Sequence, residues 1–240
     1  MIDLVDIRIT TYAIRRARTL SEAQGFPADR QCCRRDPMTT NARAFTLDIQ
    51  SQLAFYGAYH TNRYNQLIHF VFVPVILFSV AVWLAYTPAV TSFSAAAASA
   101  GYPYATLNGA FFLLFLPYSL FYALLDPVAG VSWSCCIGLP VWLGAEALRQ
   151  AHPDDAWRWA VYAHVLGWFM QIVPGHGYFE RRKPSLLDSF VQSVLLAPLF
   201  VWFELLFVFG YRRDLYDAVQ DDVRRRTAEG GMGRGLLEDD

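Results

Sequence analysis

A single uncharged run does most to limit what this chain can fold into. Between Arg63 and Asp126 the chain continues for 62 residues without an Asp, Glu, Lys or Arg. Shorter uncharged runs follow at 127–145, 159–179 and 189–203. A helix needs roughly 20 consecutive apolar residues to cross the hydrocarbon core of a bilayer. Because a soluble protein of this size rarely contains four such stretches, the sequence predicts an integral membrane protein.

Composition and charge exclude several other classes of protein. The chain has 240 residues, of which 55% are hydrophobic, too high a share for a disordered protein. Its formal net charge of −1 does not supply the basic field that a nucleic-acid binder requires, so we expect no nucleic-acid partner. The four cysteines form two adjacent pairs, at 32–33 and 135–136. This spacing is not the CxxC of a zinc or redox site, and a disulfide framework is not expected.

The apolar segments predict an all-α fold, a polytopic helical bundle in the membrane with four to five membrane segments. Four crossings are predicted, with five as the alternative, because Pro140 and Pro198 could make two segments tilted or re-entrant. Asp126-Pro127 separates two segments so closely that they should form a tight helical hairpin. The segments lie at roughly 67–86, 106–125, 128–148, 158–174 and 189–209.

Three regions differ in composition along the chain. Residues 1–43 are polar and rich in Arg, and we expect a disordered leader; its acidic residues argue against a mitochondrial presequence, and translation from Met38 is an open alternative. Residues 44–216 form the predicted membrane domain. It begins with an interfacial amphipathic helix over about 47–59. Residues 217–240 are charged and are expected to form a disordered tail.

Basic residues predict how the chain is oriented in the membrane. Arg181, Arg182 and Lys183 follow one apolar segment directly, and Arg212 and Arg213 follow the last one. The positive-inside rule therefore places both termini in the cytosol.

Four of the five histidines lie in or beside apolar segments: His60, His69, His164 and His176. Ionisable residues in a membrane are costly, so each raises the question of a function. Neutral imidazole is a frequent ligand of Fe, Zn, Cu and Ni, and a cluster of it suits a metal site. Each histidine could instead bond a backbone carbonyl within the helix core, and this structural alternative stays open.

Spacing limits how the first two histidines could meet. On one straight helix, His60 and His69 would lie about 13 Å apart on opposite faces. They can share a metal only if the chain turns between them, and residues 61–65 offer a plausible turn. Asn65 stands one helical turn before His69 and shares its face.

The later histidines are subject to the same geometry. His164 and His176 would lie about 18 Å apart on a straight helix, although Pro174-Gly175 offers a break. Glu180 stands four residues after His176. It could be a metal ligand or accept a hydrogen bond from a ligating histidine, or it could form a solvated ion pair with Arg181 or Arg182. We therefore expect His60, His69, His176 and Glu180 to converge at one membrane surface, with His164 the weakest member geometrically.

The motifs that contain these residues resemble those of the Mpo-like family of membrane proteins. The first is the run 55–60, Phe-Tyr-Gly-Ala-Tyr-His, followed by Asn65 and His69. The second is the run 175–184, Gly-His-Gly-Tyr-Phe-Glu-Arg-Arg-Lys-Pro, followed by Leu-Leu-Asp at 186–188. The third comprises Leu-Ala-Pro at 196–198, Glu204 and Gly-Tyr at 210–211, and Asp126-Pro127 with Gly130 also fits. The resemblance covers about residues 46–216.

The resemblance implies an iron(II)-dependent dioxygenase of the endoplasmic reticulum membrane. Such an enzyme shortens 2-hydroxy fatty acids by one carbon, a step of fatty acid α-oxidation in phytosphingosine breakdown. Its substrates would be a 2-hydroxy fatty acid and O2, and its cofactor Fe(2+). The family's metal ligands correspond to His60, His69, His164 and His176, with Glu180 and Asn65 as further catalytic candidates. Arg63, Arg181 or Lys183 could bind the substrate carboxylate.

Three alternatives remain open. Hydroxylases and desaturases of the histidine-box type need about eight histidines in HxxxH and HxxHH clusters, which this chain lacks. A non-enzymatic transporter or scaffold with structural histidines would carry no stoichiometric iron. A zinc hydrolase is the third, because sequence alone does not identify the metal.

Overall fold

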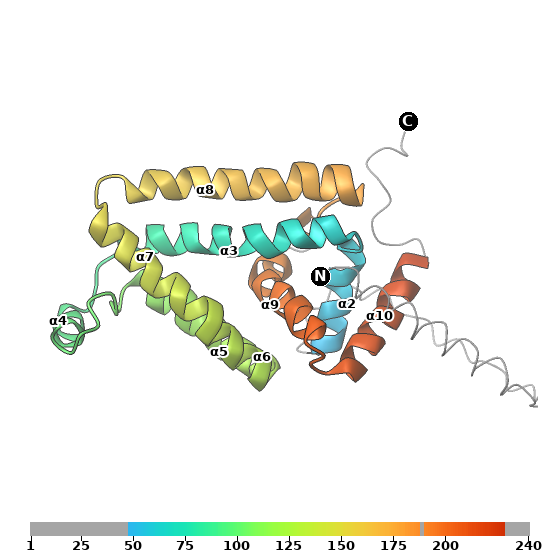
Figure 1. The fold of residues 1–240 in the computed structure, drawn as a ribbon, viewed down its shortest axis with the longest axis horizontal. Coiled ribbons are helices and arrows are strands. Elements are labelled where there is room, and N and C mark those ends of the chain that lie inside the picture. Colours follow the sequence, from blue (N-terminus) through green and yellow to red (C-terminus); the bar gives the residue numbers. More distant parts are fainter. Residues whose placement is uncertain (1–47, 188–189, 229–240) are drawn as a thin grey trace, which may run out of the picture. The chain divides into compact units, whose positions relative to one another are not determined.

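The structure is a computed structural model and describes residues 48–187 and 190–228, which contain helices and no strand (Figure 1). The predicted all-α class is confirmed. The α-helices are α2 (Ile49–Tyr59), α3 (Arg63–Ala85), α4 (Thr91–Ser99), α5 (Leu116–Leu125), α6 (Pro127–Trp133), α7 (Leu139–Ala151), α8 (Ala156–Met170), α9 (Phe190–Val208) and α10 (Arg213–Ala228). Three π-helical segments, η1 (Ala110–Phe115), η2 (Ser134–Gly138) and η3 (Gln171–Glu180), and one 3₁₀ turn, η4 (Ser185–Leu187), complete them.

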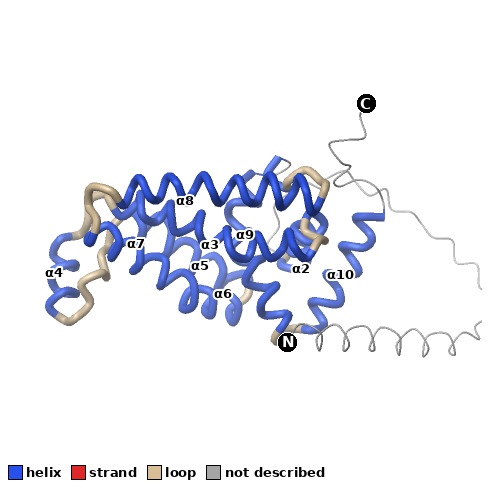
Figure 2. The backbone as a smooth tube through the Cα atoms, turned by 45° about the horizontal axis from the view of Figure 1, so that its top comes forward, coloured by secondary structure: helices blue, strands red, loops and turns tan. Residues whose placement is uncertain are grey.

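Helix α3 is the central element of the described membrane domain. It contacts α7, α8, α9 and η3, and α8 lies alongside it in both views (Figures 1 and 2). Gly167 on α8 permits this close approach, because a Cβ atom there would stand 2.7 Å from the Ile76 side chain of α3. The packing of α8 and η3 on α3 is what positions the candidate site.

By length and composition, two or three of the described helices are candidate spans, against the four to five membrane segments predicted from the apolar runs. Two described helices are long and apolar enough, Arg63–Ala85 and Pro127–Ala151. A third appears if Ser193–Val208 and Arg213–Ala228, bent by 119°, count as one broken span. The run at 106–125 forms a shorter apolar helix, Ala110–Leu125, because an uncharged run need not be one continuous helix.

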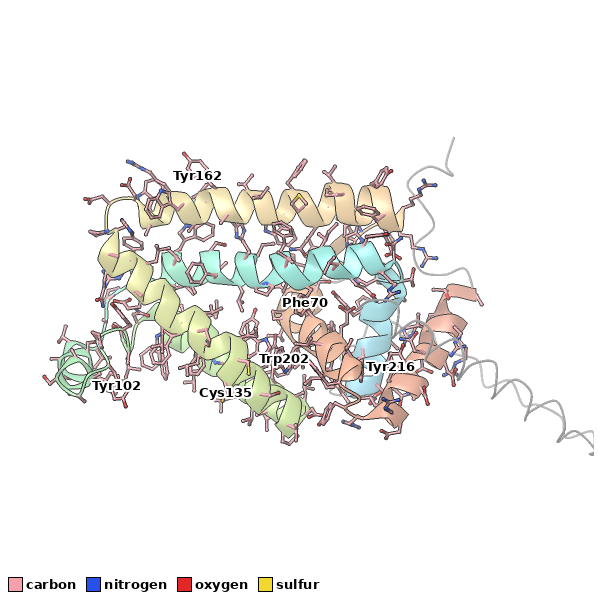
Figure 3. All side chains as sticks on the ribbon, in the orientation of Figure 1. Phe70, Tyr102, Cys135, Tyr162, Trp202 and Tyr216 are labelled. Carbon is pink, nitrogen blue, oxygen red and sulfur yellow. The ribbon has the colours of Figure 1, made fainter. Side chains whose placement is uncertain are left out.

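Apolar side chains cover the outer faces of these helices. Figure 3 shows Tyr162 projecting away from α8, and its side chain is 71% exposed. Leu124 on α5 is 84% exposed. Neither of these helices is a candidate span, but within the candidate spans Val71 of α3 is 48% exposed and Val131 of α6 is 56% exposed, as a lipid-facing surface requires.

The predicted helical hairpin at Asp126-Pro127 is confirmed. Helix α5 ends at Leu125, and α6 begins at Pro127 with the Asp126 carboxylate accepting a hydrogen bond from Ala129 N at 2.9 Å. The same carboxylate accepts bonds from Arg212 at 2.7 Å and from the Tyr211 hydroxyl at 2.8 Å. The hairpin is therefore tied to the chain after α9.

Gly130→Ala should disrupt this hairpin. The two helices touch so closely that a Cβ atom at position 130 would lie 2.2 Å from the backbone carbon of Tyr122. Overpacking against rigid backbone typically costs about 1–3 kcal/mol, so we expect a clearly lower thermal unfolding midpoint. Gly144→Ala is the control, because its nearest neighbour would be the Phe78 side chain at 3.3 Å. Equal midpoints for the two variants would contradict this account.

The end of the chain differs from the predicted disordered tail. Residues 213–228 form α10, whose buried Leu215, Val219 and Val223 recur every four residues among charged side chains and pack on α2. Gln50 of α2 donates a hydrogen bond to Asp222 at 3.0 Å. The boundary predicted at residue 217, between the membrane domain and the tail, was therefore wrong. Three apolar residues in a highly charged segment give only a weak periodic signal in the sequence. Residues 229–240 and the leader, 1–43, lie outside the described residues.

Helix α2 confirms the predicted helix over 47–59, but its buried residues are not confined to one face as the predicted amphipathic character requires. Eight of its eleven residues are buried, including Leu53 and Tyr59. Helices α9 and α10 both contact it. Helix α2 is thus a packed element that holds the first motif in a fixed position.

Candidate metal centre

Three histidines from distant parts of the chain meet in the interior. His60 follows α2, His69 lies on α3, and His176 lies on η3. Their ring centroids are 4.4 Å (His60–His69), 4.9 Å (His60–His176) and 5.1 Å (His69–His176) apart. One ring nitrogen of each lies within 4.8 Å of the other two, and all three residues are buried. The arrangement could hold a metal ion.

A tight turn brings the first two histidines together, as their spacing required. Helix α2 ends at Tyr59, and α3 begins at Arg63 after the Asn62 side chain accepts a hydrogen bond from Tyr64 N at 2.9 Å. The bend between the two helices replaces the long separation on a straight helix by ring centroids 4.4 Å apart. The predicted turn is therefore confirmed, although it occupies residues 60–62, because Arg63–Asn65 already belong to α3.

A π-helix delivers the third histidine. Segment η3 continues α8 with a wider backbone turn, and Pro174 lies inside it. π-helical segments close i→i+5 hydrogen bonds and are frequent at functional sites. Gly175 lets η3 approach α3, because a Cβ atom there would stand 2.7 Å from Asn65 Oδ1. His176 consequently faces His69 across the helix contact.

Backbone carbonyls orient two of the imidazole rings. His60 Nδ1 lies 2.8 Å from the Tyr56 carbonyl oxygen, and His69 Nδ1 lies 3.0 Å from that of Asn65. Because a carbonyl oxygen accepts, each Nδ1 carries the proton and each Nε2 presents its lone pair. His60 Nε2 and His176 Nδ1 are buried without a hydrogen-bond partner. Buried polar atoms without partners call for an explanation such as an ion.

Burial also favours the protonation state that a metal needs. Desolvation lowers the pKa of His60 well below its usual value, and the neighbouring His69 and His176 lower it further. Desolvation lowers the pKa of His176 to about 4, against a smaller opposing effect of Glu180. Both rings are therefore neutral near pH 7, the form that binds metals. A set of three imidazoles fits iron, zinc, copper or nickel.

Glu180 ties the turn to the π-helix. Its Oε1 accepts hydrogen bonds from Thr61 N at 3.0 Å and Thr61 Oγ1 at 2.6 Å. Its Oε2 accepts from Asn62 N at 2.9 Å and Asn65 Nδ2 at 3.1 Å. None of these four donors is a histidine or an arginine, so the bonds differ both from the predicted acceptor for a ligating histidine and from the predicted solvated ion pair. Arg182 donates to the Ala58 carbonyl oxygen at 3.2 Å.

His164 lies apart from this group. Trp168 Nε1 donates to its Nε2 at 2.9 Å, so the proton is on Nδ1, which lies 2.8 Å from Ser79 Oγ. Ser79 in turn donates to the Ile76 carbonyl oxygen at 2.7 Å. Both ring nitrogens are thus used in helix packing, and the residue is not part of the potential ligand group. His164 therefore fits the alternative that a histidine in these helices forms hydrogen bonds within the protein instead of binding a metal.

A cavity of about 170 Å³ begins at the three histidines. On α3 its lining residues His69, Val73, Ile76, Leu77 and Val80 lie on one face over successive turns, a length of about 16 Å at 1.5 Å per residue. The remaining lining residues are Tyr56, His60, Leu114, Tyr118, Trp168, Gln171, Ile172, His176, Pro184, Ser185, Leu186, Ser193, Val194, Ala197 and Pro198. The cavity is therefore mainly apolar beyond its histidine end.

The three predicted carboxylate-binding cations do not line this cavity. Arg63 and Arg181 are exposed and Lys183 is half-buried. The structure instead brings Tyr56 and Gln171 to the cavity, which sequence reasoning had not treated as site residues. Tyr56 stands four residues before His60, a spacing that could have marked it. Gln171 stands five before His176, and this spacing gives a shared face only in a π-helix.

Comparisons with known proteins point to one family. The family model described as 2-hydroxy-palmitic acid dioxygenase Mpo1-like matches residues 46–209. The 2-hydroxy-palmitic acid dioxygenase MPO1 of Saccharomyces cerevisiae (strain ATCC 204508 / S288c) is 36% identical over 177 residues, which cover 74% of this chain and 90% of that protein. No solved structure matches the chain. The matched range contains all three converging histidines.

Proposed function

Because the chain belongs to the family of 2-hydroxy-palmitic acid dioxygenase Mpo1-like proteins, we propose that it is an iron(II)-dependent dioxygenase that shortens 2-hydroxy fatty acids by one carbon. This reaction would be a step of fatty acid α-oxidation in phytosphingosine breakdown. The observation that carries the proposal is the convergence of three buried histidines at the end of an apolar cavity. The likeness to a 2-hydroxy-palmitic acid dioxygenase supports the substrate class.

The proposed metal ligands are His60, His69 and His176. The unpartnered ring nitrogens of His60 and His176 fit a metal ion, and three imidazoles leave coordination positions open for substrate. Iron(II), when bound, would supply the redox chemistry through which O2 reacts with the substrate. The chain's own contribution is to keep the rings neutral, to orient them through the carbonyls of Tyr56 and Asn65, and to limit access of water.

The cavity supports an amphiphilic substrate. Val73, Leu77 and Leu114 supply an apolar wall for a hydrocarbon chain, and burying each methylene contributes about 0.8 kcal/mol. A chain lying in this cavity would present its carboxyl end to the histidines. The bond between the first and second carbons, which must break, would then lie nearest the metal ligands.

We further propose an endoplasmic reticulum location with both termini in the cytosol. The two or three candidate spans support association with a membrane. The clusters at 181–183 and 212–213 support the orientation under the positive-inside rule. Glycosylation acceptors placed at either terminus should therefore remain unmodified.

The direct test supplies the purified full-length protein with Fe(2+), O2 and 2-hydroxypalmitic acid. We expect the fatty acid one carbon shorter to accumulate, detected by mass spectrometry. Palmitic acid, which lacks the 2-hydroxyl group, should be returned unchanged. Absence of stoichiometric iron together with absence of the shortened acid would favour a transporter or scaffold, and stoichiometric zinc without the shortened acid would favour a hydrolase.

A further inference from the structure

Two hydrogen-bond donors at the histidine end of the cavity have no partner. Tyr56 Oη and Gln171 Nε2 are buried and make no hydrogen bond. Both residues line the cavity, and they are only 5% and 6% exposed, respectively. Leaving a buried donor unsatisfied costs about 1–3 kcal/mol. A pair of such donors in one cavity indicates that an acceptor from outside the chain completes them.

The two donors flank the histidines whose ring nitrogens are also unpartnered. The Tyr56 ring stacks on His60, with centroids 3.8 Å apart and planes inclined by 15°. Gln171 begins the π-helix and stands one i→i+5 turn before His176. Each donor therefore has a proposed metal ligand near it in the chain. Tyr56 on α2 is paired with His60, the residue that follows this helix, and Gln171 is paired with His176 on η3.

The other polar groups of the cavity are already in use. Ser193 Oγ donates to Ser185 Oγ at 3.1 Å. The Tyr118 hydroxyl donates to the Val194 carbonyl oxygen at 3.4 Å. The polar end of the cavity is thus marked by Tyr56 and Gln171 together with the histidines.

We propose that Tyr56 Oη–H and Gln171 Nε2–H bind the oxygen-bearing head group of the substrate, the carboxylate and the adjacent hydroxyl of a 2-hydroxy acid. This inference rests on the proposed function and assigns substrate recognition to two uncharged donors within the cavity. Both groups donate, and a carboxylate only accepts, so the chemistry is complementary. Hydrogen bonds to an ionised acceptor are about twice as strong as those between neutral groups.

This assignment differs from recognition by cations. Arg63 and Arg181 are exposed and do not line the cavity. A carboxylate that binds beside the histidines leaves water and needs donors that are already in place there. Two uncharged donors also avoid placing a permanent positive charge next to a bound metal cation.

The test measures binding rather than turnover. The full-length protein, loaded with metal and in detergent, is titrated calorimetrically without O2 with 2-hydroxypalmitic acid and with its methyl ester. Tyr56→Phe and Gln171→Leu should each raise the Kd for the acid about tenfold, the equivalent of one hydrogen bond to a charged group. The Kd for the methyl ester, which has no carboxylate, should change less. Iron content should stay at the parent level.

Matched controls lie outside the cavity. Tyr122→Phe removes a hydroxyl that already donates to the Leu195 carbonyl oxygen at 2.7 Å, and Gln150→Leu removes an exposed amide bonded to the Pro103 carbonyl oxygen at 3.2 Å. Both should leave the Kd unchanged. If Gln171→Leu does not fold, Gln171→Met keeps the length of the side chain without its donor.

A Kd within twofold of the parent value for both cavity variants, with iron retained, would overturn the proposal. An equal loss of affinity for the acid and its ester would also overturn it, because that pattern indicates altered packing. Failure of the dioxygenase assay with selective loss of acid binding would remove the proposed function while leaving the head-group site in place. Chain shortening by the parent with unchanged binding in both variants would do the reverse.

Discussion

Replacing His60, His69 or His176 with Ala should abolish turnover of a 2-hydroxy fatty acid and lower the bound iron. Each residue offers one ring nitrogen to a group whose members lie within 4.8 Å of one another. Loss of one of the three proposed ligands would remove the catalyst itself, so the decrease should exceed the roughly 10–100-fold typical of changes to residues that only support a ligand. Iron is measured by elemental analysis and turnover by mass spectrometry of the shortened acid.

His164→Ala is the control for this experiment. It removes a half-buried imidazole whose two nitrogens contact Ser79 and Trp168, and iron content should stay at the parent level. Stability should fall, because Trp168 Nε1 loses its acceptor. If His164→Ala lost iron as completely as His69→Ala, the three-histidine site would be incomplete and the four-ligand set predicted from sequence would be favoured.

Glu180→Ala should destabilise the turn that holds the site together. The substitution leaves Thr61 N, Asn62 N and Asn65 Nδ2 without their acceptor. An unsatisfied buried donor costs about 1–3 kcal/mol, and Asn65 is buried while Thr61 is exposed, so the free energy of unfolding should fall by at least about 1 kcal/mol. Iron affinity should fall with it, because the turn sets the distance between His60 and His69. Chemical unfolding and a competitive chelator titration measure the two effects.

Glu180→Gln separates hydrogen bonding from charge. The amide keeps one acceptor oxygen, and the loss of stability should be smaller than for Glu180→Ala. Asp155→Ala is a surface control, since its ion pair with Arg158 is exposed and contributes less than about 1 kcal/mol. Unchanged stability and iron affinity in Glu180→Ala would show that the four hydrogen bonds to its carboxylate do not hold the turn.

The amino-acid sequence was sufficient for the features that depend on local pattern. Long uncharged runs lie in lipid or in the protein interior, where helices satisfy the hydrogen bonds of their backbone polar groups. The runs therefore predicted the all-α class. Asp126-Pro127 combines an N-cap side chain with a residue suited to the first turn, and the hairpin forms there. Spacing also required a turn after His60, because ten residues of straight helix would have separated the rings.

Only the tertiary structure decided which polar residues share the site. His164 and Gln171 share one apolar segment, yet Gln171 lies in the π-helix and lines the same cavity as His176, while His164 bonds Ser79 on a neighbouring helix. After Met170 the backbone hydrogen bonds change from the i→i+4 pattern of an α-helix to the i→i+5 pattern of a π-helix, which changes the direction of the side chains that follow. This change leaves no clear mark in the sequence. Likewise, residues 217–228 of α10 were predicted to belong to a tail, because the apolar stripe of this helix is buried only when it packs on α2. Local pattern specifies helices, but which side chains meet depends on the packing between them.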